Sequence, residues 1–218
     1  EDIERNGTAA LQGMNAILVP GGFGDRGVEG KITAVRYARE NNIPFLGICL
    51  GMHVALVEYA RNVCGLAGAD STEMNPSTPH PIVALITEWM NADGSSEQRD
   101  ESSDKGGTMR LGAYPCEIKK DSLAHKIYGA TEISERHRHR WEFNNKYIAD
   151  FEKSGLIPSG KNPATGLIEI VELKDHPVFI GVQYHPELKS TVENPQPIFV
   201  HFIKAAKAFA DKKDAVKN

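Results

Sequence analysis

The chain has 218 residues, 40% of them hydrophobic, which is enough for one sizeable core, and we expect a single domain over residues 1–218. The net charge of -4 argues against a general nucleic-acid binder, because such proteins attract phosphate groups through a positive field. Three widely spaced cysteines without a CxxC pair argue against a disulfide framework, and no apolar run approaches the roughly 18 residues that cross a bilayer, so we expect a cytoplasmic protein without a membrane partner.

Strand and helix patterns alternate at the start of the chain. The apolar run 14–20 predicts a buried strand that ends in a glycine-rich loop, and residues 28–42 are rich in helix formers. A second buried strand is predicted at 43–48, and an apolar helix at 50–64. This alternation is typical of an α/β fold with an open, mostly parallel central sheet and helices on both faces.

The second half of the chain predicts more strands and two further helices. A helix is expected at 145–154, and another begins at Pro197. The predicted strands are at 82–86, 111–118, 132–143, 166–173 and 178–184. The last two of these could pair as a β-hairpin, because only four residues separate them.

A loop, the C-terminal tail and the first residue of the chain give three further predictions. Residues 91–107 hold a single apolar side chain, Ala92, so we expect a mobile surface loop. We expect the tail 211–218 to fray. The chain begins at Glu1 without a methionine, from which we expect an excised C-terminal domain of a longer enzyme.

Cys49 is the candidate nucleophile. It lies in Gly47-Ile48-Cys49-Leu50-Gly51, the cysteine form of the nucleophile elbow, between a predicted strand and a predicted helix. Glycines flank such a cysteine because a Cβ atom would clash in the tight turn. The helix N-terminus is expected to favour the thiolate. The alternative is that Cys49 is a small core hydrophobe at a close-packed strand end.

A cysteine nucleophile needs a base and a group that orients the base. His185 follows the predicted strand at 178–184, and Glu187 lies two residues further on, across Pro186. Taken alone, such a pair is more often an ordinary loop. Together with the elbow, it predicts a Cys49, His185 and Glu187 triad.

A tetrahedral intermediate also needs backbone N–H donors. Leu50 follows the nucleophile and supplies one donor by the geometry of the elbow. The glycine-rich loop 20–24 is the candidate for the second donor, because glycine lets the backbone approach a ligand closely. The alternatives for this loop are a phosphate loop or a plain tight turn, and it lacks the lysine of a Walker motif.

The elbow, the glycine loop and the late His-Pro-Glu together resemble the class I glutamine amidotransferases. Within that class, "FLGICLGMH", "GGTMRLGAYPC" and "SERHRHRWEFN" resemble the glutaminase domains of CTP synthases, over nearly the whole chain. The resemblance implies a flavodoxin-like fold of this class. It also implies that Cys49 attacks the side-chain amide of L-glutamine, that His185 moves the proton and that Glu187 orients His185.

The resemblance further implies the residues that hold glutamine. Gly22 and Leu50 would form the oxyanion hole. A carboxylate and a guanidinium suit the ammonium and carboxylate groups of an amino acid. The residues implied to bind glutamine are Gly22, Leu50, Gly51, Met52, His53, Glu73 and Arg140.

The same resemblance implies partners outside this chain. A thioester would form, and ammonia would pass to an N-terminal synthetase domain of the same polypeptide that aminates ATP-activated UTP to CTP. ATP, UTP and Mg²⁺ are expected on that domain, with GTP as an allosteric activator of a homotetrameric enzyme. No cofactor is expected here, and no metal site, because no histidine or carboxylate spacing converges on one.

His53 stands where the family usually has glutamine. It lies four residues after Cys49, on the same helical face, so it could contact the substrate or even compete as the base. We expect a tolerated substitution in the pocket, with His185 as the base.

The Arg-His run at 136–140 has a separate interpretation as an RNA or anion patch. In a strand, alternation places the three arginines on one face and the two histidines on the other, which divides the charge. Without interleaved aromatic residues, nucleic-acid binding is not expected.

Two other functions compete with that of a glutaminase. A regulatory domain without turnover conflicts with the intact Cys49, His185 and Glu187 set. A free-standing amidase or peptidase conflicts with the stretches that resemble CTP synthase. Activity on glutamine as against peptides would separate these possibilities.

Overall fold

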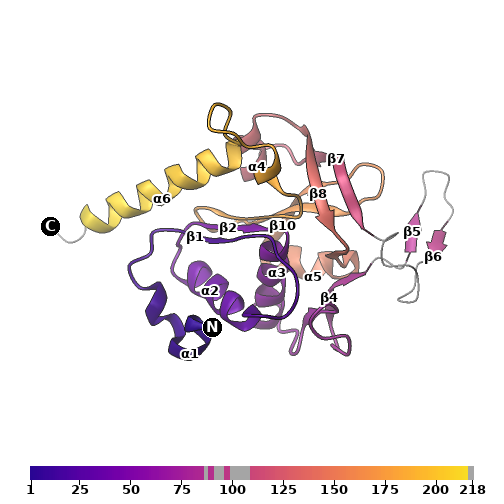
Figure 1. The fold of residues 1–218 in the computed structure, drawn as a ribbon, viewed down its shortest axis with the longest axis horizontal. Helices are drawn as coiled ribbons and strands as arrows, with labels where there is room; N and C mark the ends of the chain where they lie inside the picture. The colour runs from indigo at the N-terminus through magenta and orange to yellow at the C-terminus, as the bar shows by residue number, and fades with distance from the viewer. Residues whose placement is uncertain (86–87, 91–95, 99–108, 216–218) are drawn as a thin grey trace.

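The computed structural model describes residues 1–85, 88–90, 96–98 and 109–215. Its centre is a sheet of seven strands in the order β1-β2-β12-β11-β10-β7-β8, with helices around it (Figure 1). The strands of this sheet are β1 (Ile17–Val19), β2 (Phe45–Ile48), β7 (Arg110–Ile118), β8 (Glu132–His139), β10 (Leu156–Lys161), β11 (Ile168–Leu173) and β12 (Phe179–Val182).

The parallel part of the sheet is the part that presents Cys49. Strand β2 pairs in parallel with β1 on one side and with β12 on the other. From β12 onward, β11, β10, β7 and β8 are all antiparallel to their neighbours. The α/β class is therefore confirmed, with its parallel strands confined to the core, and the predicted hairpin is confirmed as β11 and β12.

Helices cover both faces of the sheet, as expected. Helices α2 (Val28–Glu40) and α3 (Leu50–Asn62) lie on one face, and α4 (Leu123–Tyr128) and α6 (Pro197–Ala215) on the other (Figure 1). Alternation along β2 serves both faces. Phe45 packs in the cluster that includes α2 and α3, whereas Leu46 packs in the cluster that includes α4 and α6.

The smaller elements complete the described chain. They are α1 (Asp2–Asn6), a 3₁₀ helix (Gly7–Leu11), β3 (Asp70–Ser71), β4 (Pro81–Leu85), β5 (Glu88–Met90), β6 (Ser96–Gln98), β9 (Trp141–Phe143), a 3₁₀ helix (Asn145–Tyr147), α5 (Ile148–Ser154) and a 3₁₀ helix (Pro186–Leu188). Strands β3, β4 and β9 form a second sheet. None of the helices within the described ranges is long and apolar enough to cross a membrane.

Two predicted segments fall partly outside the described residues. Of the predicted loop 91–107, only Ser96–Gln98 is described, and it forms β6, paired with β5. Helix α6 extends through Ala215, so residues 211–215 of the predicted tail are helical. Residues 216–218 are not among the described residues.

The strand predicted at 132–143 is wrong as a single element. It divides at Arg140 into β8, which belongs to the large sheet, and β9, which pairs with β4 in the second sheet. The division turns the chain at Arg140 from one sheet to the other. Strand β10 was missed, because Pro158 and Gly160 are residues that usually argue against a sheet interior. Its register with β11 shifts at those two residues.

The two elbow glycines allow very close packing. A Cβ atom at Gly51 would lie 2.0 Å from the carbonyl oxygen of Val19, and one at Gly47 would lie 2.5 Å from the carbonyl oxygen of Gly51. Real Cβ atoms do not approach other atoms so closely. The first turn of α3 can therefore rest on the end of β1 only without these side chains, which is the steric reason that the sequence motif predicted.

We expect Gly51→Ala to lower the free energy of unfolding by about 3 kcal/mol, since its methyl group meets rigid backbone. The matched control is Gly30→Ala in α2, where a Cβ atom would meet mainly the flexible side chain of Glu4, at 3.2 Å. Alanine favours a helix over glycine, so the control should be neutral or stabilised by up to about 1 kcal/mol. Urea denaturation of both variants measures the difference, and equal effects would contradict the packing argument.

Candidate active site

Cys49 lies at the strand-to-helix junction that the sequence predicted. It stands between β2 and α3 with φ of 52°, an uncommon backbone conformation for a residue other than glycine. Its backbone N–H donates to the carbonyl oxygen of Val182 on β12, at 2.7 Å, so two strands fix the turn. Only 4% of Cys49 is exposed. The geometry is that of a strained nucleophile elbow.

The thiol of Cys49 differs from the sequence-based expectation of a thiolate. Its pKa is raised to about 12, mainly by burial and to a smaller extent by the nearby carboxylates of Glu142, Glu73 and Glu187. The backbone N–H of Leu50 at the helix start lowers the pKa, as expected, but burial outweighs this effect. A raised pKa favours the neutral thiol, so Cys49 would need a base to act as a nucleophile.

His185 and Glu187 form the second half of the predicted triad. His185 Nδ1 is 2.6 Å from Glu187 Oε1, while His185 Nε2 is buried and has no hydrogen-bond partner among the described residues. A methyl group at Gly21 would lie 2.6 Å from His185 Cε1 and 3.7 Å from Cys49 Cβ, so the imidazole and the cysteine side chain converge beside Gly21. Nε2 is thus the nitrogen available to accept a proton.

The carboxylate of Glu187 favours this arrangement of the imidazole. Burial is the largest single effect and opposes its ionisation. The hydrogen bond with His185, a backbone hydrogen bond and the charge of His185 together outweigh burial, so the pKa of Glu187 is lowered. An ionised carboxylate accepts the Nδ1 proton and leaves Nε2 as the acceptor.

The glycine loop lies next to the start of helix α3. A Cβ atom at Gly22 would lie 3.1 Å from a side-chain carbon of Leu50. Gly24 N–H donates to Glu73 Oε1 at 3.0 Å, which ties the same loop to a predicted glutamine ligand. The two candidate oxyanion residues, Gly22 and Leu50, are therefore neighbours, as the sequence analysis required.

A pocket of about 460 Å³ opens beside Cys49 and His185. It brings Glu73 and Arg140, the predicted ligands for the two charged groups of an amino acid, into the same cavity as the nucleophile and base. Its lining residues are Gly22, Phe23, Cys49, His53, Glu73, Met109, Arg138, His139, Arg140, Trp141 and His185.

Gly51 and Met52 do not line this pocket. Gly51 packs against Val19, and the side chain of Met52 is fully buried in the core beside Gly181. Their assignment as glutamine ligands stays a prediction, and their observed contacts are structural.

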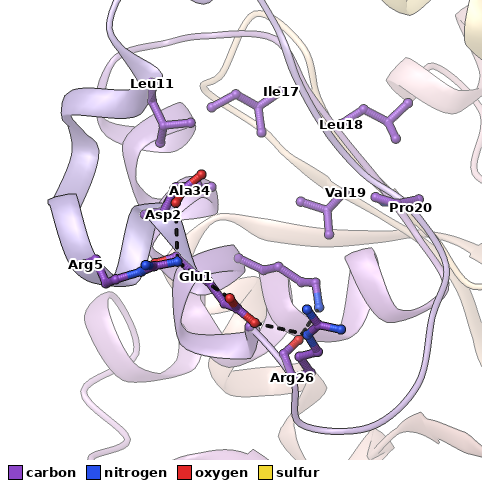
Figure 2. Close-up of a pocket in the computed structure, with 14 residues that line it drawn as sticks. Glu1, Asp2, Arg5, Leu11, Ile17, Leu18, Val19, Pro20, Arg26 and Ala34 are labelled. Atoms are coloured by element: carbon purple, nitrogen blue, oxygen red, sulfur yellow. Dashed lines mark hydrogen bonds and ion pairs between the residues drawn. The ribbon is translucent and has the colours of Figure 1, made fainter.

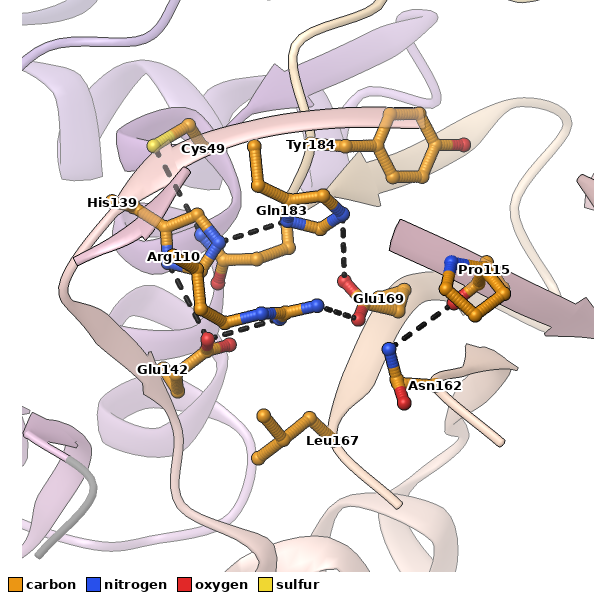
Figure 3. A network of polar contacts seen from close by, with 12 residues as sticks. Cys49, Arg110, Pro115, His139, Glu142, Asn162, Leu167, Glu169, Gln183 and Tyr184 are labelled. Carbon is orange, nitrogen blue, oxygen red and sulfur yellow. Dashed lines mark hydrogen bonds and ion pairs between the residues drawn. The ribbon is translucent and has the colours of Figure 1, made fainter. Parts of the chain in front are cut away.

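His53 lines the pocket and is buried. Its Nε2 is 2.8 Å from Gln183 Oε1. Gln183 Nε2 in turn lies 3.9 Å from Cys49 Sγ (Figure 3). Burial lowers the pKa of His53 to about 4, with the Gln183 bond opposing the shift. His53 is thus neutral, and its Nε2 already makes a hydrogen bond with Gln183. Both features disfavour His53 as the base.

Buried ionic groups lie behind the pocket. Arg110 bonds Glu142 at 3.0 Å and Glu169 at 2.7 Å (Figure 3). Next to them, His137 Nδ1 is 2.9 Å from His139 Nε2, and His139 lines the pocket. Burial raises the pKa of Glu142 to about 8 despite Arg110. Arg110, Glu142 and Glu169 are all buried, so this cluster is not a second solvent-facing site.

The predicted alternation of the Arg-His run is observed along β8. His137 and His139 are buried, whereas Arg136 and Arg138 are exposed. Arg140, at the turn between β8 and β9, lines the pocket. Along β8 the arginines and the histidines therefore lie on opposite faces, as expected, and the positive charge stays on the exposed arginines because burial lowers the pKa of both histidines.

Several pocket residues were missed by the sequence analysis. Phe23, Met109 and Trp141 line the cavity, and Phe23 is 90% exposed. Phe23 was detectable, because it lies inside the glycine loop that was singled out. Gln183 was also missed, although it precedes His185 by only two residues, because its contact with His53 spans 130 positions.

A larger pocket, of about 660 Å³, lies elsewhere, between β1 and the N-terminal residues (Figure 2). Its lining includes Leu18, Arg5 and Glu1, and Glu1 pairs with Arg26 at 3.1 Å. None of the predicted catalytic residues lines it, so we assign the chemistry to the smaller pocket. Among the residues that the structure describes, no group of three or more histidine, cysteine or acidic residues is arranged to hold a metal ion.

Comparison with curated proteins supports the resemblance noted in the sequence. The chain is 62% identical over 193 residues to a CTP synthase of Flavobacterium johnsoniae, covering 88% of this chain and 34% of that protein. It is 60% identical over 199 residues to a CTP synthase of Cytophaga hutchinsonii, covering 91% and 35%. The chain thus spans about a third of the length of these relatives.

Comparison with solved structures agrees. The glutaminase domain of Trypanosoma brucei CTP synthase, with bound acivicin, matches with a TM-score of 0.84 and 38% identity, over 95% of this chain and 78% of that one. A Thermoplasma acidophilum protein described as a putative GMP synthase component matches with a TM-score of 0.57 and 16% identity, over 95% and 80%, which is a likeness of fold alone. The family model for glutamine amidotransferase class I matches residues 1–205, and the chain belongs to that family, alongside the glutaminase domains of CTP synthases.

Proposed function

We propose that this chain hydrolyses the side-chain amide of L-glutamine to glutamate and ammonia. The observation that carries the proposal is one pocket that holds Cys49 and His185 together with Glu73 and Arg140. The first pair can perform acyl transfer, and the second pair matches the charges of a free amino acid.

In the proposed mechanism, His185 Nε2 takes the proton from the Cys49 thiol as the sulfur attacks the amide carbon. The developing oxyanion accepts hydrogen bonds from the backbone N–H groups of Gly22 and Leu50. Protonated His185 then gives its proton to the leaving nitrogen, ammonia departs and a thioester remains. Because the pKa of the thiol is raised, we place proton transfer and sulfur attack in one step.

Water completes the cycle. His185 accepts a proton from the water as its oxygen attacks the thioester carbon, and the intermediate releases glutamate as the Cys49 sulfur departs and is reprotonated. Glu187 stabilises the imidazolium at both stages through the 2.6 Å contact with Nδ1.

The fate of the ammonia follows from the relatives. Since the matched proteins are CTP synthases about three times as long, we propose that ammonia passes to an N-terminal synthetase domain that converts UTP to CTP. ATP, UTP and Mg²⁺ would be bound there. Activation by GTP and a homotetramer stay predictions for that longer enzyme.

The first test is covalent labelling with a diazoketone analogue of glutamine. The carbon that bears the diazo group takes up the thiol proton, and the sulfur displaces N₂. We expect a single adduct in the intact mass, lost in Cys49→Ala and blocked by excess glutamine or by acivicin. A folded chain labelled equally well in Cys49→Ala, or protected by a peptide but not by glutamine, would contradict the proposal.

The second test separates the two histidines near Cys49. His185→Ala should slow labelling and glutamine hydrolysis by at least about a thousandfold, since the thiol then loses its proposed base. His53→Gln should retain most of both activities, because glutamine can also hydrogen-bond Gln183. The reverse pattern would assign the base role to His53.

The third test follows the pH dependence of Cys49 towards iodoacetamide, which needs no glutamine site. Only the thiolate reacts, so a pKa of about 12 predicts a rate that rises about tenfold per pH unit up to pH 10 without a plateau. Cys49→Ala supplies the background from the other cysteines. A plateau near neutral pH would mean that Cys49 rests as a thiolate.

A further inference from the structure

The short segment that carries His185 and Glu187, here named the catalytic loop (residues 185–189), is held by few contacts of its own. It makes one 3₁₀ turn, in which Leu188 N–H donates to the carbonyl oxygen of His185 at 3.2 Å and Lys189 N–H to that of Pro186 at 3.1 Å. Single turns of this kind are weak, so a precise position for His185 requires outside support.

That support comes from strand β8. It is the last strand of the large sheet and, among the described strands, pairs only with β7, so its other edge carries no strand. The backbone N–H of His185 donates to the carbonyl oxygen of Arg136 at 2.8 Å, and Lys189 Nζ donates to that of Ser134 at 2.6 Å. Carbonyl groups two residues apart point to the same edge of a strand. One edge of β8 therefore holds both ends of the catalytic loop.

Between these two carbonyl groups, β8 buries a carboxylate. The side chain of Glu135 is 3% exposed, and its Oε1 lies 3.5 Å from Lys189 Nζ. Its Oε2 is buried without a hydrogen-bond partner in the described part of the chain. Burying a carboxylate is costly, and an ion pair with one partially exposed member seldom stabilises a fold. A role in holding Lys189 at a fixed point would explain why the carboxylate of Glu135 is buried here.

We propose that Lys189 and Glu135 are positioning residues for the catalytic histidine: they fasten the far end of the catalytic loop to β8 and so fix His185 beside Cys49. The inference rests on the proposed glutaminase activity. Glu73 and Arg140 lie outside the loop, so the anchor should affect the chemical step and leave glutamine binding unchanged.

The test measures how fast the diazoketone analogue labels Cys49, as a function of its concentration. Lys189→Met keeps the aliphatic chain and removes the ammonium group. We expect the maximal labelling rate to fall about tenfold, because a small displacement of a catalytic group is costly, with the half-saturating concentration unchanged. Lys189→Arg should restore most of the rate. Lys207→Met, which removes an exposed ion pair on α6, is the matched control and should label like the native chain.

A double variant distinguishes positioning from mere stability. Glu135→Gln combined with Lys189→Met removes the unpaired buried charge, so its melting temperature should recover while labelling stays slow. Recovery of both would overturn the proposal, as would normal labelling of Lys189→Met alone. If the native chain itself is not labelled, the proposed function fails, and this inference fails with it.

Discussion

The active site depends on the contact between the start of helix α3 and the end of strand β1. Gly51 has no room for a side chain there, because Val19 O would lie 2.0 Å from its Cβ atom. This approach forces the sharp turn at Cys49, with its φ of 52°, and brings the first N–H of the helix to the sulfur. It also brings the glycine loop that follows β1 against Leu50. The proposed nucleophile and the proposed oxyanion donors are thus positioned by the same contact.

Burial of the nucleophile has a chemical consequence. A thiol whose pKa is about 12 is inert at neutral pH without a partner, so its reactivity depends on His185. The ionised carboxylate of Glu187 accepts the Nδ1 proton of His185, which leaves Nε2 free to accept a proton. A buried thiol with a raised pKa is a poor target for unselective oxidation and alkylation, whereas the proposed mechanism lets it attack an amide bound beside His185. Burial of Cys49 therefore makes the thiol both selective and dependent on the proposed base.

The sequence predicted what depends on short motifs and missed what depends on distant contacts. The Cys49 elbow, the role of its glycines and the alternation along β8 follow from local sterics and a period of two, and the structure has all of them. The pKa of Cys49 was expected to fall, because the helix start is visible in a sequence whereas the depth of burial is not. Gln183 and the Arg110 cluster could not be predicted, because their contacts join residues far apart in the sequence. Strand β10 was hidden by Pro158, which sequence rules treat as a break.

The two halves of the site are supported in different ways. Cys49 sits in the parallel core, where β2 is paired on both sides. His185 lies just beyond the end of β12, in a loop whose outside support is the outer edge of β8. The large sheet therefore connects the proposed nucleophile and base through β12, and under our proposal the edge strand sets the final position of the base. An unpaired strand edge is usually a liability that proteins cover, and here two of its carbonyl groups accept hydrogen bonds from the loop that carries the proposed base.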